Sequence, residues 1–215
     1  MAALLDNYTH ISFDLDGTLV HTVPEYRFDV VPRTIRELGG HVPQDEAIID
    51  QFWFTSGRDE VIAEHFGIEP EVFWDHFHSI DDAKTRAEYT SPYDDVAPVL
   101  RALKKSGKTI SLITDAPDFI ADLEIAHLPP NMFDCYISNA SHGFTQKPDP
   151  ESMAHALKQI SATPSETVYI GNSMGDAVFA KNAGVDFIFA DRKEHASDAH
   201  LHARHHIHSL ADLLA

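Results

Sequence analysis

The sequence predicts an α/β protein with a parallel sheet and one inserted helical subdomain. Short apolar runs alternate with segments of helical period, and one long interval contains helical segments only. Hydrophobic residues make up 43% and charged residues 23% of the 215 residues, which is typical of a chain that folds around its own core.

Five short runs rich in β-branched and aromatic residues predict strands. They cover residues 10–13, 109–113, 133–137, 167–170 and 185–190. Among the intervening segments, Val96, Leu100 and Leu103 follow the spacing of one helix face, and Asp149-Pro150 predicts the N-cap and first turn of another helix. Because strands that alternate with helices form βαβ crossovers, the sheet is expected to be parallel and buried on both faces.

One interval breaks the alternation and contains four helical candidates without a convincing strand. These are Arg27–Leu38, Gln44–Phe54, Arg58–Phe66 and Glu71–Arg86. A block of roughly 65–70 residues is too long for a simple crossover. We therefore expect a core of residues 1–20 and 90–215 and a helical subdomain of residues 21–89.

The charge balance narrows the classes of partner. Sixteen Lys and Arg against 34 Asp and Glu give a formal net charge of −18, which disfavours nucleic acid and anionic membranes. A small anionic substrate is still allowed if a local cation or a metal ion reverses the potential in a cleft.

The remaining composition predicts a soluble cytoplasmic protein. Cys135, the single cysteine, cannot form an internal disulfide and is expected in the core. Residues 1–9 lack a basic start and an apolar run, and no stretch approaches the about 18 apolar residues of a membrane span. The sequence does not indicate the oligomeric state.

Histidine is unusually abundant, with six of the 15 near the C-terminus. These six are His195, His200, His202, His205, His206 and His208. They could hold a transition metal. Alternatively, they form a polar connection to a last strand at residues 207–209 and a short helix at residues 210–214.

The sharpest local pattern directly follows the first predicted strand. Asp14 and Asp16 are two residues apart on a chain that turns at Gly17. Carboxyl ends of parallel strands face the ligand crevice, and two carboxylates so close repel unless a cation joins them. The pattern therefore indicates a metal site, with Mg²⁺ the expected ion. The alternative is an Asp-Gly turn with a capping acid.

Three further strand ends carry polar groups. Thr114-Asp115 follows the second strand, Lys147 follows the third after a short loop, and Asn172 and Asp176 follow the fourth. Taken singly, Thr114 could be a helix N-cap, Lys147 a solvated loop charge, and the segment 171–176 an ordinary turn. Together, in this order, they supply what phosphoryl chemistry requires: a nucleophile, hydrogen-bond donors, a fixed cation and a metal cage.

On these motifs the chain resembles a haloacid dehalogenase (HAD) superfamily hydrolase of the phosphatase type. Residues 91–96, 168–173 and 180–185 also resemble the phosphoglycolate phosphatase and β-phosphoglucomutase branch. The resemblance implies a Rossmann-like core and a helical cap, inserted after the first motif, that opens and closes over the cleft.

The resemblance also implies a role for each motif residue. Asp14 would attack phosphorus, form an aspartyl-phosphate and ligate Mg²⁺. Asp16 would act as general acid and base, with its backbone carbonyl on the metal. The remaining expected roles are phosphoryl binding by Thr114 and the amide of Asp115, charge compensation by Lys147, metal binding by Asn172 and Asp176, and orientation of Asp16 by Thr18.

Three positions depart from the family pattern. Asn172 stands where an acid is usual, so Mg²⁺ affinity is expected to fall. Asp115 stands where asparagine is more common, and its carboxylate would repel a phosphate unless it points away. His21 stands where an acid is common near the cap hinge.

In the expected cap, Gly57 and Arg58 lie in the segment 55–58, where related caps carry a specificity loop. The Arg58 guanidinium could bind a second anionic group of the substrate. Alternatively, Arg58 begins a helix and pairs with Asp59 or Glu60. The aromatic residues Trp53, Phe54, Trp74 and Phe77 are expected in the cap core.

The leading function is that of a Mg²⁺-dependent phosphatase for a small phosphorylated metabolite, of the phosphoglycolate or sugar phosphate type. A phosphoglucomutase-like enzyme would share the first step but return the phosphate to the sugar. A haloacid dehalogenase is disfavoured, because that branch needs no metal and generally lacks the second acid, here Asp16. The third alternative is a non-catalytic binding module, which Asn172 and Asp115 favour.

Overall fold

The computed structural model describes residues 4–55, 57–194 and 197–215, arranged as two compact units. The first unit ends at His21 and resumes at Ser91, and the second unit is Thr22–Thr90. Among the described helices, none combines the length and the apolar character needed to cross a membrane.

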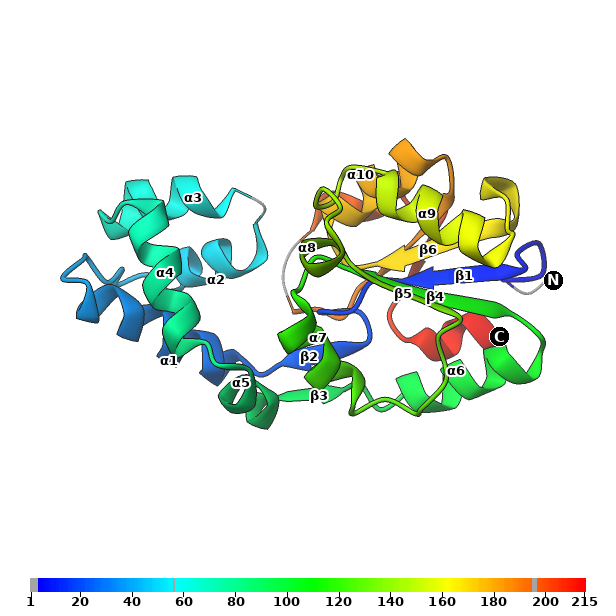
Figure 1. The fold of residues 1–215 in the computed structure, drawn as a ribbon, viewed down its shortest axis with the longest axis horizontal. Coiled ribbons are helices and arrows are strands. Elements are labelled where there is room, and N and C mark those ends of the chain that lie inside the picture. The colour runs from blue at the N-terminus through cyan, green and yellow to red at the C-terminus, as the bar shows by residue number, and fades with distance from the viewer. Residues whose placement is uncertain (1–3, 56, 195–196) are drawn as a thin grey trace. The chain divides into compact units, whose positions relative to one another are not determined.

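The first unit contains a six-stranded parallel sheet in the order β5-β4-β1-β6-β7-β8 (Figure 1). The strands are β1 (His10–Phe13), β4 (Thr109–Thr114), β5 (Cys135–Ser138), β6 (Thr167–Gly171), β7 (Asp186–Ala190) and β8 (His205–Ile207). This arrangement confirms the predicted α/β class, and Cys135 is buried in β5 as expected.

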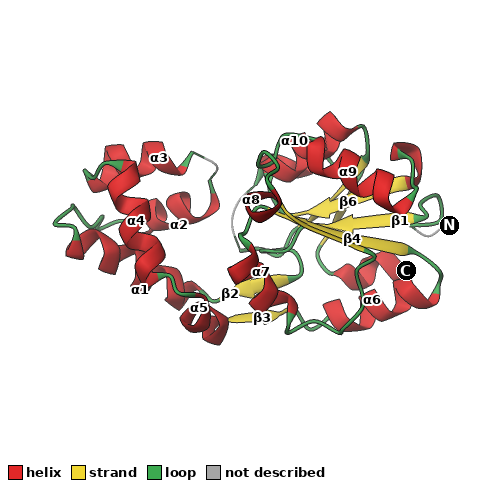
Figure 2. Cartoon of the chain, in the orientation of Figure 1, coloured by secondary structure: helices red, strands yellow, loops and turns green. Residues whose placement is uncertain are grey.

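Alternate residues of each strand pack on opposite faces of the sheet. In β6, Val168 and Ile170 join one apolar cluster and Tyr169 joins the other. The helices that contribute to the first cluster are α6 (Val96–Lys105), α7 (Asp118–Ile125) and η4 (Leu210–Leu214). Those that contribute to the second are α9 (Glu151–Ile160), α10 (Met174–Ala183) and η3 (Asp198–His202). Helices therefore cover both faces (Figure 2).

Two short elements complete this unit, α8 (Asn139–His142) and η2 (Pro164–Glu166). Several predicted boundaries were wrong, among them the start of β5, which is Cys135 instead of residue 133. Two others have a visible cause. Pro150, not Asp149, is the N-cap of α9, and the Asp149 carboxylate accepts from the amide of Glu151. The last strand covers residues 205–207 instead of 207–209, because the hydroxyl of Ser209 caps η4 by accepting from the amide of Ala211.

The second unit is helical. It contains α1 (Pro24–Glu37), α2 (Glu46–Phe54), α3 (Arg58–Val61) continued by the π-helical turn η1 (Ile62–Phe66), α4 (Pro70–Ile80) and α5 (Ala83–Tyr89). Its core is aromatic: Phe52 lies 5.5 Å from Phe66 and 5.3 Å from Phe73, measured between ring centroids. Phe77 is buried there, with Trp53 and Trp74 packed at its margin, as expected; Phe54 instead lies under the Arg27 guanidinium.

The predicted helix over residues 71–86 was wrong, because two helices occupy this interval. The carboxylate of Asp82 accepts from the amides of Lys84 and Thr85 and starts α5. The buried Asp81 ends α4 and accepts a hydrogen bond of 2.6 Å from the hydroxyl of Tyr26. Side chains that cap and anchor the chain between the two helices therefore override the continuous apolar pattern.

The chain passes between the units through two short paired strands, β2 (Val20–Thr22) and β3 (Thr90–Pro92). The hydroxyls of Thr22 and Thr90 lie 2.8 Å apart. The sequence did not predict these strands, because each has only three residues.

Candidate active site

Polar residues from three neighbouring strands meet at the carboxyl edge of the sheet. Asp14 follows β1, Thr114 ends β4 and Asn172 follows β6. Because β1 lies between β4 and β6 and runs parallel to both, the three strand ends adjoin. In open parallel sheets this edge is the usual position of a ligand site.

Lys147 joins two buried carboxylates at this edge. Its Nζ lies 2.6 Å from Oδ1 of Asp14 and 2.7 Å from Oδ1 of Asp176. It also donates to the hydroxyl of Tyr169 at 3.2 Å. The side chains of Lys147 and Asp14 are each 8% exposed, and that of Asp176 is 1% exposed. Two carboxylates can share this space because the ammonium offsets their repulsion.

The ionisation of these groups follows from burial and from their neighbours. Burial opposes the charge of Lys147, but Asp14 and Asp176 outweigh it and raise the lysine pKa well above its ordinary value. Burial raises the pKa of Asp14, the negative charge of Asp176 raises it further, and Lys147 opposes both effects. Burial also raises the pKa of Tyr169, so its hydroxyl keeps its proton. Lys147 is therefore a fixed cation in this site.

Asp176 anchors the loop between β6 and α10. Its Oδ2 accepts from the amide of Asn172 at 3.1 Å, the amide of Ser173 at 3.0 Å and the hydroxyl of Ser173 at 2.7 Å. Gly171 makes room for this carboxylate, since a Cβ there would lie 2.6 Å from its Cγ. Because its other oxygen holds Lys147, Asp176 positions the lysine and caps the helix at once.

The turn after β1 needs glycine for two reasons. Gly17 has a φ of +70°, and a Cβ on it would lie 2.0 Å from Nδ2 of Asn172. Glycine therefore lets the Asn172 amide approach the turn that carries the half-buried Asp16. The hydroxyl of Thr18 donates to Oδ2 of Asp14 at 3.1 Å. The sequence did not predict this bond, because the spacing does not show how the tight turn brings Thr18 to Asp14. Orientation of Asp16 by Thr18 stays a prediction.

The second motif is held from the side of β5. Oδ1 of Asp115 accepts from Nδ2 of Asn139 at 2.7 Å and from the amide of Lys147 at 3.1 Å. One oxygen of Asp115 is thus engaged in fastening the Lys147 loop. The hydroxyl of the buried Thr114 accepts from the amide of Ala116 at 3.1 Å, which leaves its proton available as a donor.

The donor set fits a hard divalent cation. Asp14, Asp16 and Asp176 bring three carboxylates toward this edge, whereas Lys147 brings one ammonium, so negative charge is in excess. Oxygen donors with excess negative charge suit Mg²⁺. Asp14, Asp16 and Asn172 could hold the ion, with Asp176 acting through water because both of its oxygens already accept hydrogen bonds.

Residues 8–184 match the family model of the haloacid dehalogenase-like hydrolases. The chain belongs to this family. The predicted fold and the predicted class of enzyme, a HAD-family hydrolase, are confirmed.

Two curated relatives of this HAD hydrolase are named as phosphatases. The phosphoglycolate phosphatase of Pseudomonas putida is 27% identical over 186 residues, which cover 83% of this chain and 67% of the relative. The N-acetylmuramic acid 6-phosphate phosphatase of Pseudomonas aeruginosa is 28% identical over 178 residues, which cover 81% of this chain and 77% of the relative.

Solved structures agree with the fold. A structure described as a haloacid dehalogenase-like hydrolase from Bacteroides fragilis has a TM-score of 0.78 and 28% identity, over 96% of this chain and 99% of that chain. CbbY from Rhodobacter sphaeroides, solved in complex with phosphate, has a TM-score of 0.71 and 20% identity, over 96% of each chain. The second likeness concerns the fold alone.

The two residues expected to read the substrate lie in the helical unit of this HAD hydrolase. Gly57 is the N-cap of α3, and Arg58 is its first residue. The Arg58 guanidinium donates to the carbonyls of Trp53 at 3.0 Å and Thr55 at 3.3 Å, where α2 ends. These bonds satisfy carbonyls at a helix C-terminus, which is a structural role. Ser56, also in the expected specificity segment, lies outside the described residues.

Sequence reasoning missed three residues that organise the HAD site. Tyr169 contacts Lys147, Ser173 forms the capping box with Asp176, and Asn139 holds Asp115. The hydroxyl of Tyr169, between the apolar residues Val168 and Ile170, was a usable signal. The roles of Ser173 and Asn139 depend on which loops adjoin, and this is not encoded in local spacing.

Proposed function

We propose that this HAD hydrolase is a Mg²⁺-dependent phosphatase that hydrolyses a small phosphorylated metabolite through an aspartyl-phosphate. The observation that carries the proposal is the buried Asp14 carboxylate, held between the ammonium of Lys147 and the hydroxyl of Thr18 at the end of β1. An oriented carboxylate beside a fixed cation is a suitable nucleophile for a phosphate ester. The phosphatase names of the relatives support this class of substrate.

The proposed reaction has two steps. A carboxylate oxygen of Asp14 forms a bond to phosphorus while the bond from phosphorus to the leaving oxygen breaks, and Asp16 gives that oxygen its proton. Asp16 then takes a proton from water, which attacks phosphorus and releases inorganic phosphate and the free Asp14. Lys147, the Thr114 hydroxyl and the Asp115 amide hold the phosphoryl oxygens in both steps. A bound Mg²⁺ would supply compensation for the charge that the phosphoryl group and Asp14 share.

We further propose that the helical unit, residues 22–90, is the cap that selects the substrate, with Gly57 and Arg58 contributing to recognition. The Arg58 guanidinium is a candidate for a second anionic group on the substrate. The cytoplasmic location remains a prediction from the sequence.

The test is Mg²⁺-dependent release of phosphate from a panel that includes phosphoglycolate, sugar phosphates and N-acetylmuramic acid 6-phosphate. Asp14→Asn removes the nucleophile, so turnover is expected to fall by at least about 10³-fold. Asp94→Asn, at an exposed position and purified in the same way, is the matched control and should keep wild-type turnover. Wild-type turnover in Asp14→Asn would refute the covalent mechanism.

A non-catalytic binding module is the second candidate, because Asn172 brings no charge to the expected metal site. Asn172→Asp restores that charge and is expected to lower the Mg²⁺ concentration needed for half-maximal turnover. If the folded wild type releases no phosphate from any member of the panel and Asn172→Asp does, the wild-type chain is the binding module.

A further inference from the structure

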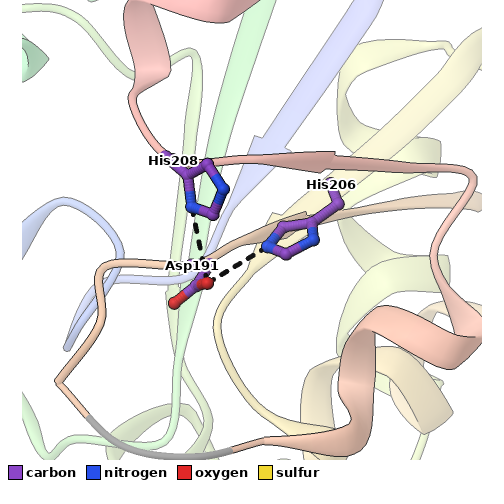
Figure 3. Close-up of side chains that lie close together, drawn as sticks. All are labelled: Asp191, His206 and His208. Carbon is purple, nitrogen blue, oxygen red and sulfur yellow. Dashed lines mark hydrogen bonds and ion pairs between the residues drawn. The ribbon is translucent and has the colours of Figure 1, made fainter.

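A second group of metal-ligand side chains lies at the edge of the sheet. Asp191 follows β7, His206 is in the edge strand β8, and His208 follows β8 (Figure 3). Each residue offers one ligand atom, and these three atoms lie within 4.8 Å of one another. None of these residues belongs to the site around Lys147.

Strand register explains why these three converge. Phe189 is paired with His206, and the amide of Asp191 donates to the carbonyl of Ile207 at 2.8 Å. His208 comes directly after β8, two residues beyond His206, so the alternation of the strand continued by one residue places both side chains on the same side. Both imidazoles point at a single carboxylate oxygen, as Figure 3 shows.

The two distances from the Asp191 carboxylate suit a small tetrahedral cation, and all three ligand atoms lie within 4.8 Å of one another. Oδ2 of Asp191 lies 3.2 Å from Nε2 of His206 and 3.4 Å from Nδ1 of His208. With metal–ligand bonds of about 2.0–2.2 Å, the ligands of a tetrahedral zinc ion are roughly 3.3–3.5 Å apart. A cation can therefore sit among these atoms with small changes of side-chain torsion.

Neighbouring groups already hold the side chains of Asp191 and His206 and the backbone of His208. Oδ1 of Asp191 accepts from the amide of Lys193 at 2.9 Å, which leaves Oδ2 directed at the imidazoles. The ring of His206 packs on Phe189 at a centroid distance of 5.1 Å. The amide of His208 donates to Asp212 at 3.1 Å. Such supporting contacts orient ligands before a metal binds.

We propose that Asp191, His206 and His208 bind one transition-metal ion, Zn²⁺ in the first instance, at a site separate from the carboxylate site that suits Mg²⁺. Two imidazoles and one carboxylate are a donor set for Zn²⁺ and its neighbours, whereas Mg²⁺ prefers oxygen alone. Because β8 has only three residues, a metal that joins it to the end of β7 would fasten the edge strand.

The test is calorimetric titration of tag-free protein with Zn²⁺ in excess Mg²⁺, which occupies the carboxylate site. The wild type is expected to bind one equivalent, and the double variant His206→Ala/His208→Ala is expected to lose it. His202→Ala/His205→Ala is the matched control: it removes the same number of histidines, and strand alternation places His205 on the opposite face from His206. Equal loss in both double variants, or no binding by the wild type, would overturn the proposal.

Thermal unfolding gives a second readout that does not depend on activity. Zn²⁺ is expected to raise the Tm of the wild type and of the control, and to leave that of His206→Ala/His208→Ala unchanged. Asp191→Asn retains both imidazoles and is expected to bind Zn²⁺ at least about tenfold more weakly than the wild type. Unchanged affinity in Asp191→Asn would exclude the carboxylate from the site and overturn the three-residue assignment.

Discussion

The polar clusters around Lys147 and around Asp191 differ in how their charges are stabilised. Around Lys147, two carboxylates and an ammonium are almost completely buried and hold one another. Around Asp191, the side chains of His206 and His208 are 39% and 58% exposed, so water can solvate them. Loss of one partner should therefore be costly in the buried cluster and cheap in the exposed one.

The largest effect is expected from Lys147→Met, which leaves Asp14 and Asp176 buried without their cation. The free energy of unfolding should fall by about 3–5 kcal/mol. Lys104→Met is the matched control, because Lys104 pairs with Asp134 at a similar distance of 2.7 Å but is 29% exposed. It should cost less than about 1 kcal/mol. Similar losses in urea unfolding would contradict the comparison.

Acid should lower the free energy of unfolding through a third polar group, the buried His10. Its ring nitrogens lie 3.0 Å from the hydroxyl of Thr109 and 2.9 Å from that of Ser111. Burial lowers the pKa of His10 from 6.5 to about 4. The folded protein therefore keeps His10 neutral while the unfolded chain binds a proton below pH 6.5. This contribution is complete above pH 6.5 and is lost as the pH falls toward 4.

Between pH 6.5 and pH 4, the protonation of His10 should lower the free energy of unfolding by on the order of 3 kcal/mol. The decrease is measured as the slope of unfolding free energy against pH, compared with the slope of His10→Gln. The variant lacks the titrating group, so its slope should be shallower. Equal slopes would show that His10 does not carry the effect.

A smaller effect is expected from substitution of Gly17. A second glycine variant separates the cost of backbone strain at this position from the cost of the contact with Asn172. Gly17→Ala and Gly143→Ala both place a Cβ at positive φ, +70° and +77°, and this backbone strain alone should cost about 1–2 kcal/mol at each position. Only at Gly17 does the new Cβ meet another group, since nothing lies within 4 Å of it at Gly143. Turnover should therefore fall about 10²-fold in Gly17→Ala. An equal loss in Gly143→Ala would argue against a role for the Asn172 contact.

The smallest effect is expected from Asp191→Asn in the presence of a chelator. Without metal the exposed cluster is an ordinary surface contact, so the unfolding free energy should change by less than about 0.5 kcal/mol. A loss of several kcal/mol in chemical denaturation would show that the cluster stabilises the fold without metal.

The alternation of short apolar runs with helical segments was sufficient to predict the parallel sheet. The polar residues at the strand ends pointed to Lys147 and Asp176 as neighbours of Asp14. Apolar periodicity did not separate α4 from α5, because the break depends on the partners of Asp81 and Asp82. The hydrogen bond from Thr18 to Asp14 depends on the path of a turn, which residue spacing alone does not describe. The histidine spacing was visible, but its partner Asp191 is brought near only by the register of β7 and β8.

The pairing of β2 with β3 brings the two ends of the helical unit together, with the hydroxyls of Thr22 and Thr90 in contact. The insertion connects the adjacent strands β1 and β4, and because its two ends lie together, its length does not change the arrangement of the sheet. The entropy of closing such a loop grows slowly with the number of inserted residues. Evolution can therefore lengthen, trim or exchange the segment from Thr22 to Thr90 while the chemistry at Asp14 stays as it is. One core sheet can in this way be inherited with many different inserted segments.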